Sequence, residues 1–254
     1  MDGIPDSLVQ FFKDNPNPAL AFSGGTDSTY LMYVCRRLDV DMIPVYFMGS
    51  FQTVGELVNV ENLCKRYGFN PEFIEYDTLS EKEIILNKAD RCYKCKRLMF
   101  KKMWNRVKQF NRKYMMDGTN ASDDREDRPG MKALEELGVR SPLKECGLTK
   151  ADVRRLSREA GINSWDFPSN SCLATRIPTG MVITEELLDR TNRAEKDIRL
   201  LGFRDIRVRT VDEETCLLEV LPSQMDFLEE NKSDVERALL RYFDEVSYGT
   251  RKTE

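Results

Sequence analysis

The chain has 254 residues, of which 41% are hydrophobic and 32% charged, a composition typical of a globular protein rather than a disordered one. It contains no histidine, which excludes Ser-His and Cys-His triads, imidazole acid–base catalysis and histidine-ligated zinc hydrolases. Its net charge of −4 argues against a broad electrostatic surface for nucleic acid. No apolar run approaches the roughly 18 residues of a membrane-spanning helix, and the acidic N-terminus lacks the features of a secretion signal, so we expect a cytoplasmic protein without a membrane partner.

Residues 19–150 alternate short β-rich runs with helical stretches, the pattern of parallel βαβ units. The sequence therefore predicts an α/β domain built on a parallel sheet. Pro44 indicates that its strand is an edge strand or that the proline lies at the strand's beginning. The predicted strands are 19–22, 42–47, 72–76 and 113–116, and the predicted helices between and after them include 29–38, 54–67 and 149–161.

A loop rich in Pro, Ser and Asn follows from residue 162 to 180, and loops of this length inside compact proteins are usually functional or linkers. Beyond it we expect a small α+β domain, for which a ferredoxin-like arrangement is one option. Its predicted elements are a helix over 184–201, strands over 205–209 and 216–220, and a helix over 233–243. The predicted organisation is a domain over 1–165, a functional loop over 166–182 and a second domain over 183–254.

A short Gly-rich segment lies directly between the first predicted strand and the first helix: Ser23-Gly24-Gly25-Thr26-Asp27-Ser28. Glycines let a backbone turn tightly around an anion, which helix-terminal N–H groups and hydroxyls then bind. The segment is neither a Walker A loop nor a G-x-G-x-x-G loop. The alternative is a turn that serves backbone geometry only.

Three of the seven cysteines are candidates for chemistry. Cys92 and Cys95 are spaced i, i+3 in a predicted helix and share one face, but this pattern alone fits zinc, redox chemistry or packing. No second C-x-x-C and no histidine completes a zinc site. Cys172, in the 162–180 loop, is the third candidate. Three thiolates on a 4Fe–4S cluster would leave one iron open for an extra sulfide, whereas the alternative for Cys172 is an ordinary loop thiol.

The Ser-Gly-Gly-x-Asp-Ser motif resembles that of the PP-loop ATP pyrophosphatase superfamily, whose members adenylate a substrate oxygen. The resemblance implies an adenine nucleotide alpha hydrolase-like fold, with a parallel sheet covered by helices on both faces. It also implies that ATP and Mg²⁺ bind here, with adenine held near the end of the second strand. The implied ATP ligands are Ser23, Gly24, Gly25, Asp27, Ser28, Tyr46 and Phe47.

Further motifs make the resemblance more specific. Over roughly residues 15–210 the chain resembles the LarE family of ATP-dependent sulfur transferases. That family adenylates a carboxylate of pyridinium-3,5-biscarboxylic acid mononucleotide and installs sulfur as a thiocarboxylate, on the way to the nickel-pincer nucleotide cofactor. The motifs, in chain order, are Asp90-Arg91-Cys92-Tyr93-x-Cys95-Lys96, Asp117-Gly118-Thr119-Asn120, Asp127-Arg128-Pro129-Gly130, Arg140-Ser141-Pro142-Leu143 and Pro168-Ser169-x-x-Cys172-Leu173-Ala174-x-Arg176.

The resemblance also bears on the sulfur source and the partners. Because all three of Cys92, Cys95 and Cys172 are present, the sequence predicts a 4Fe–4S cluster that delivers external sulfide. The alternative within the family is that Cys172 gives up its own sulfur and becomes dehydroalanine. The implied partners are a small-molecule nucleotide substrate, a sulfide source or sulfur carrier, and further copies of the chain, with a hexamer as the family's precedent.

Several charged residues are predicted to support the site. Residues 123–128 form either a solvated turn or a site in which Asp123 joins Asp27 on Mg²⁺ and Arg128 binds phosphate. Lys144 is a further candidate for the ATP phosphates. Arg176 is predicted to bind substrate. Arg207 and Arg209 point the same way on a predicted strand; the resemblance implies contact with the mononucleotide phosphate, and the alternative is ion pairs with Asp205 or Asp212.

Three other functions fit parts of the pattern. A tRNA-thiolating enzyme of the same superfamily shares the loop and a three-cysteine cluster, but it usually adds zinc-binding cysteine pairs and basic surfaces. An amidoligase would use ammonia in place of sulfide and would not need the three cysteines. A non-catalytic nucleotide-binding module would bind ATP without releasing pyrophosphate. The C-terminal sequence, Ser247-Tyr248-Gly249-Thr250-Arg251-Lys252, departs from the Gly-x-x-x-Gly-Ser-like end common in LarE-type chains.

Overall fold

The computed structural model describes residues 3–123, 129–167 and 171–251, and they form two compact units. Unit 1 consists of residues 3–77, 92–123 and 129–167. Unit 2 consists of residues 78–91 and 171–251. Two separate stretches of the chain therefore build each unit, and each unit has a hydrophobic core of its own.

Unit 1 is built on a four-stranded sheet in the order β3-β2-β1-β4, and every neighbouring pair is parallel. The strands are β1 (Pro18–Ala21), β2 (Ile43–Gly49), β3 (Glu72–Tyr76) and β4 (Tyr114–Met116). In β1, Ala19 is in register with Ile43 of β2 and with Met115 of β4. The chain reverses its direction of travel across the sheet between β3 and β4, which makes the β1–β4 boundary the switch point where open α/β sheets bind ligands.

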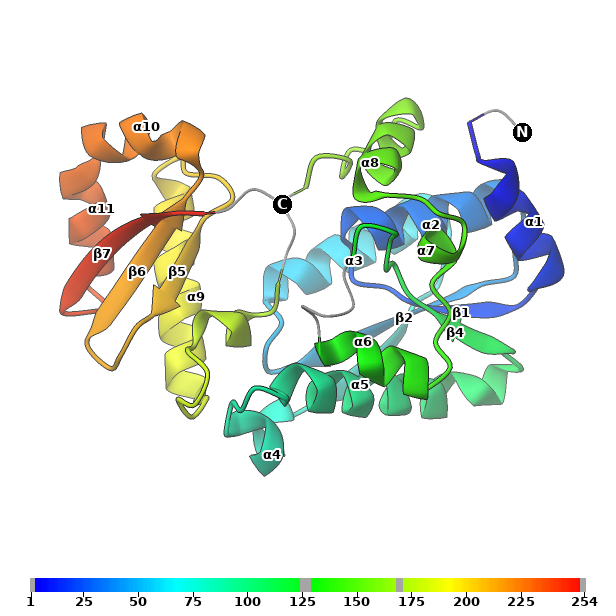
Figure 1. Ribbon diagram of the computed structural model, residues 1–254, viewed down its shortest axis with the longest axis horizontal. Helices are drawn as coiled ribbons and strands as arrows, with labels where there is room; N and C mark the ends of the chain where they lie inside the picture. The colour runs from blue at the N-terminus through cyan, green and yellow to red at the C-terminus, as the bar shows by residue number, and fades with distance from the viewer. Residues whose placement is uncertain (1–2, 124–128, 168–170, 252–254) are drawn as a thin grey trace. The chain divides into compact units, whose positions relative to one another are not determined.

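Helices cover both faces of this sheet, which confirms the predicted α/β architecture (Figure 1). Alternate residues of β1 enter different cores, because successive side chains of a strand point to opposite faces: Leu20 packs with one set of helices and Ala19 with the other. The first face carries α1 (Asp6–Asp14), α2 (Thr26–Arg37), α3 (Val54–Tyr67), α7 (Pro142–Glu145) and α8 (Lys150–Glu159); the second carries α5 (Arg91–Val107), the 3₁₀ turn η2 (Lys108–Phe110) and α6 (Pro129–Glu136).

Pro44 lies at the beginning of an interior strand, so the edge-strand alternative is wrong and the placement at a strand's beginning is confirmed. The carbonyl of Val45 accepts a hydrogen bond from Phe22, just past β1. The backbone of the preceding Pro44 therefore faces the β3 side, since successive residues of a strand alternate. Pairing with β3 begins only at Val45, so the missing N–H of Pro44 costs no ladder hydrogen bond.

Unit 2 contains a mixed sheet in the order β5-β6-β7, in which β6 is antiparallel to β5 and parallel to β7. Three strands with a parallel pair do not make the βαββαβ arrangement of a ferredoxin-like domain, so that option is wrong for the part of unit 2 that is described. The elements are the 3₁₀ turns η1 (Thr78–Ser80), η3 (Leu173–Arg176) and η4 (Pro222–Gln224), the helices α4 (Lys82–Ile85), α9 (Glu185–Leu200), α10 (Met225–Glu230) and α11 (Lys232–Leu239), and the strands β5 (Arg207–Thr210), β6 (Thr215–Val220) and β7 (Glu245–Thr250).

Within the described ranges, none of the helices has the length and apolarity that crossing a membrane requires.

Capping boxes begin two helices of unit 1. Thr53 accepts a hydrogen bond from the Glu56 amide through its hydroxyl, and the Glu56 carboxylate accepts one from the Thr53 amide. Thr149 and Asp152 make the same reciprocal pair at the start of α8. Each box satisfies amides that a helix end otherwise leaves without intrahelical partners.

We expect Thr53→Ala to lower the free energy of unfolding by about 1 kcal/mol, because the Glu56 amide loses its acceptor. Thr53→Ser keeps the hydroxyl and should remain close to the wild type. Urea titration followed by far-UV circular dichroism measures both variants. Equal unfolding midpoints for Ala and Ser would contradict the role of this hydroxyl.

Candidate active site

The loop between β1 and α2 requires glycine at Gly24. Its φ is +74°, in the left-handed region. A Cβ atom at this position would lie 2.8 Å from Nδ2 of Asn59 and 3.1 Å from Cγ2 of Val60, both on α3. The same Asn59 amide donates a hydrogen bond to the Gly24 carbonyl at 3.2 Å. The loop is thus fixed against α3 as well as by its own turn.

The hydroxyl groups of the loop gather at the beginning of α2. The Oγ atoms of Ser23 and Ser28 lie 3.1 Å apart, and the Gly25 amide donates to Ser23 Oγ at 3.4 Å. Gly25 is the N-cap of α2, and within the described chain no side chain caps this helix end. The first turn of a 12-residue helix therefore presents its amides together with two hydroxyls, an arrangement suited to phosphate oxygens.

The segment after β4 lies directly against this loop. A Cβ atom on Gly118 would lie 3.0 Å from the amide nitrogen of Ser28 and 3.2 Å from Cβ of Asp27. The buried carboxylate of Asp117 holds the segment in place, accepting hydrogen bonds from the Thr119 amide and hydroxyl and from the Ser141 hydroxyl. The predicted Ser-Gly-Gly-x-Asp-Ser and Asp-Gly-Thr-Asn motifs therefore meet at the carboxyl edge of the sheet.

Asp27 lies at this edge and is half-buried. Nζ of Lys150 lies 2.5 Å from its Oδ2. Its Oδ1 is buried and has no hydrogen-bond partner among the described residues. Burial raises the pKa of Asp27 above its usual value, the ammonium of Lys150 opposes that shift, and the charge of Asp123 adds to it. A buried carboxylate oxygen without a partner fits a hard cation such as Mg²⁺.

Lys150 is a site residue that the sequence analysis did not identify. It opens α8 directly after the capping residue Thr149, and its partner Asp27 is 123 residues earlier in the chain. No local pattern reports such a distance. The available signal was the position of Lys150 at the start of a helix. A cation near a helix N-terminus is unfavourable with respect to the helix dipole, so an acidic partner is expected nearby.

The remaining predicted nucleotide ligands lie in several places. Asp123 is half-buried, accepts a hydrogen bond from the Asn120 amide at 3.0 Å and is close enough to influence Asp27. Lys144 is half-buried on α7, and its amide donates to the Thr119 carbonyl at 3.2 Å, next to the Asp117–Asn120 segment. Arg128 lies outside the described residues.

The side chains of Tyr46 and Phe47 belong to the two cores of unit 1. Tyr46 is 3% exposed and packs edge-on against Phe73, and Phe47 is 4% exposed beside Tyr76. The Tyr46 hydroxyl is buried without a hydrogen-bond partner among the described residues, and burial raises its pKa. The groups that could make the predicted adenine contact at the end of β2 are therefore the backbone of this strand and the Tyr46 hydroxyl.

The cysteines divide by burial. Cys35, Cys64 and Cys216 are buried, and burial raises their pKa values, to about 12 for Cys64 and Cys216. Cys92 and Cys95, in the first two turns of α5 in unit 1, Cys172, the N-cap of η3 in unit 2, and Cys146 are partly exposed. In residues 3–123, 129–167 and 171–251 no group of three or more His, Cys, Asp or Glu side chains is arranged to hold a metal ion.

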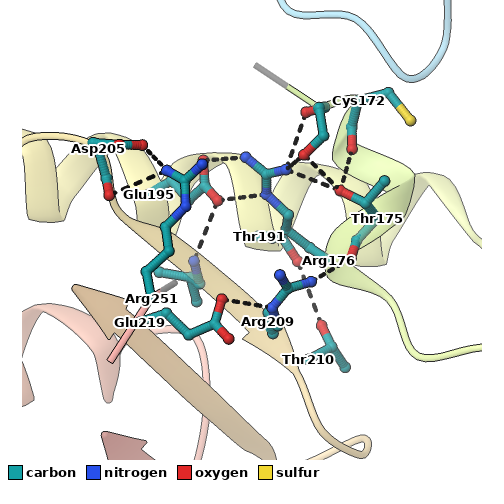
Figure 2. Close-up of polar contacts among 12 residues, drawn as sticks. Cys172, Thr175, Arg176, Thr191, Glu195, Asp205, Arg209, Thr210, Glu219 and Arg251 are labelled. Atoms are coloured by element: carbon teal, nitrogen blue, oxygen red, sulfur yellow. Dashed lines mark hydrogen bonds and ion pairs between the residues drawn. The ribbon is translucent and has the colours of Figure 1, made fainter. Parts of the chain in front are cut away.

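The predicted substrate arginines have protein partners in unit 2. Arg176 is 4% exposed, and its Nε donates to Oε1 of Glu195 at 2.7 Å. Arg209 donates from Nε to Glu219 at 2.7 Å, an ion pair with a partner other than the predicted Asp205 or Asp212. Arg207 is half-buried on the same side of β5 as Arg209. Figure 2 shows the network around these groups.

Comparison with known proteins decides the family. The chain is 31% identical over 207 residues to pyridinium-3,5-bisthiocarboxylic acid mononucleotide synthase of Lactiplantibacillus plantarum, covering 80% of this chain and 74% of the synthase. The chain belongs to the LarE family. A second relative, an uncharacterized protein of Synechocystis, is 32% identical over 221 residues, or 87% of this chain and 82% of that protein.

A more distant likeness was also found. One component of the glutamine-hydrolyzing GMP synthase of Sulfurisphaera tokodaii is 28% identical over 179 residues, which cover 60% of this chain and 46% of that component. No protein-family model matches the chain.

We expect Asp27→Asn to raise the free energy of unfolding at neutral pH in buffer containing EDTA. Because the folded-state pKa of Asp27 lies above its unfolded value, the folded protein loses stability as the pH rises through that raised pKa. Asparagine cannot ionise, so the variant avoids this loss of stability. Its free energy of unfolding should exceed that of wild type between pH 6 and 8, and the difference should vanish near pH 3.

Asp152→Asn is the matched control with the opposite sign. Hydrogen bonds from Thr149 hold the pKa of Asp152 below its usual value, so neutralising Asp152 should lower stability at neutral pH. Urea midpoints between pH 3 and 8 measure both variants. A loss of stability in Asp27→Asn at pH 7 would contradict the conclusion that burial disfavours the charge of Asp27.

Proposed function

We propose that this chain is an ATP-dependent sulfur transferase that converts a carboxylate of pyridinium-3,5-biscarboxylic acid mononucleotide into a thiocarboxylate. The observation that carries the proposal is Asp27, a half-buried carboxylate whose buried Oδ1 has no partner among the described residues, placed inside a loop of amides and hydroxyls in a chain of the LarE family. The name of the Lactiplantibacillus relative supports the substrate class. The likeness to GMP synthase supports the use of ATP.

In this proposal, the Ser23–Ser28 loop and the first amides of α2 bind the β- and γ-phosphates of ATP. Asp27, with Asp123 close by, is the proposed ligand of Mg²⁺, which neutralises phosphate charge. Lys150 and Lys144 supply further positive charge at the same edge. Lys150 now neutralises Asp27, so a cation that takes over Asp27 would leave the Lys150 ammonium for a phosphate oxygen.

The reaction begins when a substrate carboxylate oxygen attacks the α-phosphorus of ATP. The bond between the α-phosphorus and the bridging oxygen breaks, and pyrophosphate leaves with the electron pair. The resulting acyl adenylate carries AMP, a far better leaving group than hydroxide. A sulfur nucleophile then attacks the acyl carbon, the bond to the AMP oxygen breaks, and the thiocarboxylate and AMP are the products.

The sulfur source is the finer part of the proposal. Cys92 and Cys95 share one face of α5 and are partly exposed, as is Cys172, whereas Cys35, Cys64 and Cys216 are buried. The thiolates of Cys92, Cys95 and Cys172 are the proposed ligands of a 4Fe–4S cluster, which would supply a sulfide at its open iron. In the alternative, Cys172 attacks the acyl adenylate itself, and loss of its α-proton breaks the Cβ–S bond, leaving dehydroalanine.

The partners follow from this chemistry. The nucleotide substrate is a small molecule, and a cluster-borne sulfide requires a sulfide source or a sulfur-carrier protein that reloads it. The net charge of −4 favours a small-molecule substrate over tRNA.

Cys172→Ala should separate the two halves of the reaction. We expect pyrophosphate release to continue at a rate within about threefold of wild type, because adenylation needs no thiol, while thiocarboxylate formation falls below detection. Cys146→Ala, which changes another partly exposed cysteine, is the matched control and should retain both activities. Loss of pyrophosphate release in Cys172→Ala alone would contradict this division of roles.

The sulfur source is tested on protein purified without oxygen. Cluster delivery predicts about four irons per chain with acid-labile sulfide, both lost in Cys92→Ala and retained in Cys146→Ala. A protein without iron, whose intact mass falls by one sulfur and two hydrogens after turnover, would contradict the cluster and assign Cys172 as the donor.

A further inference from the structure

Three arginines donate to main-chain carbonyls of the turn that carries Cys172. Nη1 of Arg176 donates to the Ser171 carbonyl at 3.0 Å, Nη1 of Arg91 to the Ala174 carbonyl at 2.7 Å, and Nη1 of Arg209 to the Thr175 carbonyl at 2.8 Å. They come from η3, from the first residue of α5 and from β5, respectively. We call these three guanidinium groups and the carbonyls they bind the turn clamp.

Each guanidinium of the turn clamp is itself fixed by a second acceptor. Arg91 donates to Oδ1 of Asn87 at 2.5 Å, and the Asn87 amide in turn donates to the Ile177 and Pro178 carbonyls. Arg209 is held by Glu219 at 2.7 Å. Charge-assisted hydrogen bonds from a rigid fork restrict both ends of each contact, so each of these contacts limits the positions that the turn can take.

The third guanidinium is held by the most buried ion pair of the clamp. The side chains of Arg176 and Glu195 are 4% and 2% exposed. Glu195 on α9 also accepts hydrogen bonds from the Val208 amide and from Arg199. The turn is thus connected through Arg176 and Glu195 to both a helix and a strand of unit 2.

The clamp acts on the backbone and leaves the thiol outside it. The Cys172 carbonyl accepts hydrogen bonds from the amide and the hydroxyl of Thr175, at 3.0 and 2.8 Å. In Figure 2 the sulfur of Cys172 points away from the guanidinium groups of Arg176 and Arg209. Fixed carbonyls with an outward sulfur are the arrangement expected where a thiol must be presented in one orientation.

We propose that Arg91 and Arg209 are positioning residues that hold the Cys172 turn in the conformation that sulfur transfer uses. The buried Arg176–Glu195 pair holds the same turn from within unit 2. The proposal rests on the proposed function, because it assumes that Cys172 takes part in the transfer step. A reacting group held in place avoids the entropy of ordering its loop at each turnover.

The first test uses Arg91→Gln, Arg91→Lys and, as the matched control, Arg193→Gln, which removes an exposed arginine paired with Asp189 on α9. We expect Arg91→Gln to slow thiocarboxylate formation at least tenfold while pyrophosphate release stays within about threefold. Arg91→Lys keeps one donor and should recover part of the loss. The control should behave as wild type. Equal transfer rates in Arg91→Gln and wild type would overturn the proposal.

A second readout does not depend on turnover. The rate at which iodoacetamide alkylates Cys172, measured by peptide mass spectrometry relative to Cys146 in the same sample, should change at least threefold in Arg91→Gln and Arg209→Lys. It should be unchanged in Arg193→Gln. An unchanged ratio in both clamp variants would overturn the proposal. A wild-type protein inactive in both half-reactions would refute the proposed function, and the alkylation ratio would still test the clamp's hold on the turn.

Kinetic measurements on an Arg209 variant distinguish a positioning role from a substrate-binding role. Positioning predicts that Arg209→Lys lowers kcat for sulfur transfer with the KM for the mononucleotide within about twofold. A tenfold higher KM with an unchanged alkylation ratio would assign Arg209 to the substrate phosphate and overturn its place in the clamp.

Discussion

The pairing of β1 with β2 on one side and β4 on the other is the constraint on which the candidate site depends. Parallel strands end at the same edge, so the loop after β1 and the segment after β4 are brought together. Gly118 then lies so close to the Ser28 amide that a methyl group would not fit without a shift. A one-residue slip of β1 would exchange Ala19 and Leu20 between the two cores, which fixes the register of the whole edge.

That edge holds a carboxylate in an environment that disfavours its charge. Burial raises the pKa of Asp27 even though Lys150 lies within hydrogen-bonding distance. We expect a neutral residue here to be more favourable for folding, and the proposed role of Asp27 as a cation ligand accounts for the carboxylate. The same edge supplies two serine hydroxyls and a helix end that no described side chain caps, which are the proposed ligands of the ATP phosphates.

Unit 2 shows a different use of charge. Its buried Arg176–Glu195 pair is expected to stabilise the fold less than a hydrophobic pair of the same size, because removing two charges from water is costly. The pair instead connects the Cys172 turn to α9 and β5, and Arg91 and Arg209 bind the neighbouring carbonyls. Buried charge in this unit is therefore best understood as fixing one conformation of a short turn.

Much of the sheet of unit 1 could be predicted from the sequence, because most of its strands are short apolar runs separated by helical stretches. The strand β7 was missed because it is a half-exposed edge strand without strong alternation, and α10 because it has only six residues. The phosphate-type loop is visible in the sequence because its residues are contiguous. Lys150 and the Glu219 partner of Arg209 are not, because their contacts span the fold or cross between strands.

The central claim is that the chain activates a carboxylate by adenylation. Its most direct test is the fate of the carboxylate oxygens. Pyridinium-3,5-biscarboxylic acid mononucleotide labelled with ¹⁸O in its carboxylates is incubated with the protein, ATP, Mg²⁺ and sulfide, and the AMP is analysed by mass spectrometry. The account predicts that each AMP carries one ¹⁸O atom, transferred when sulfur displaces the adenylate. Unlabelled AMP, formed alongside thiocarboxylate, would contradict it.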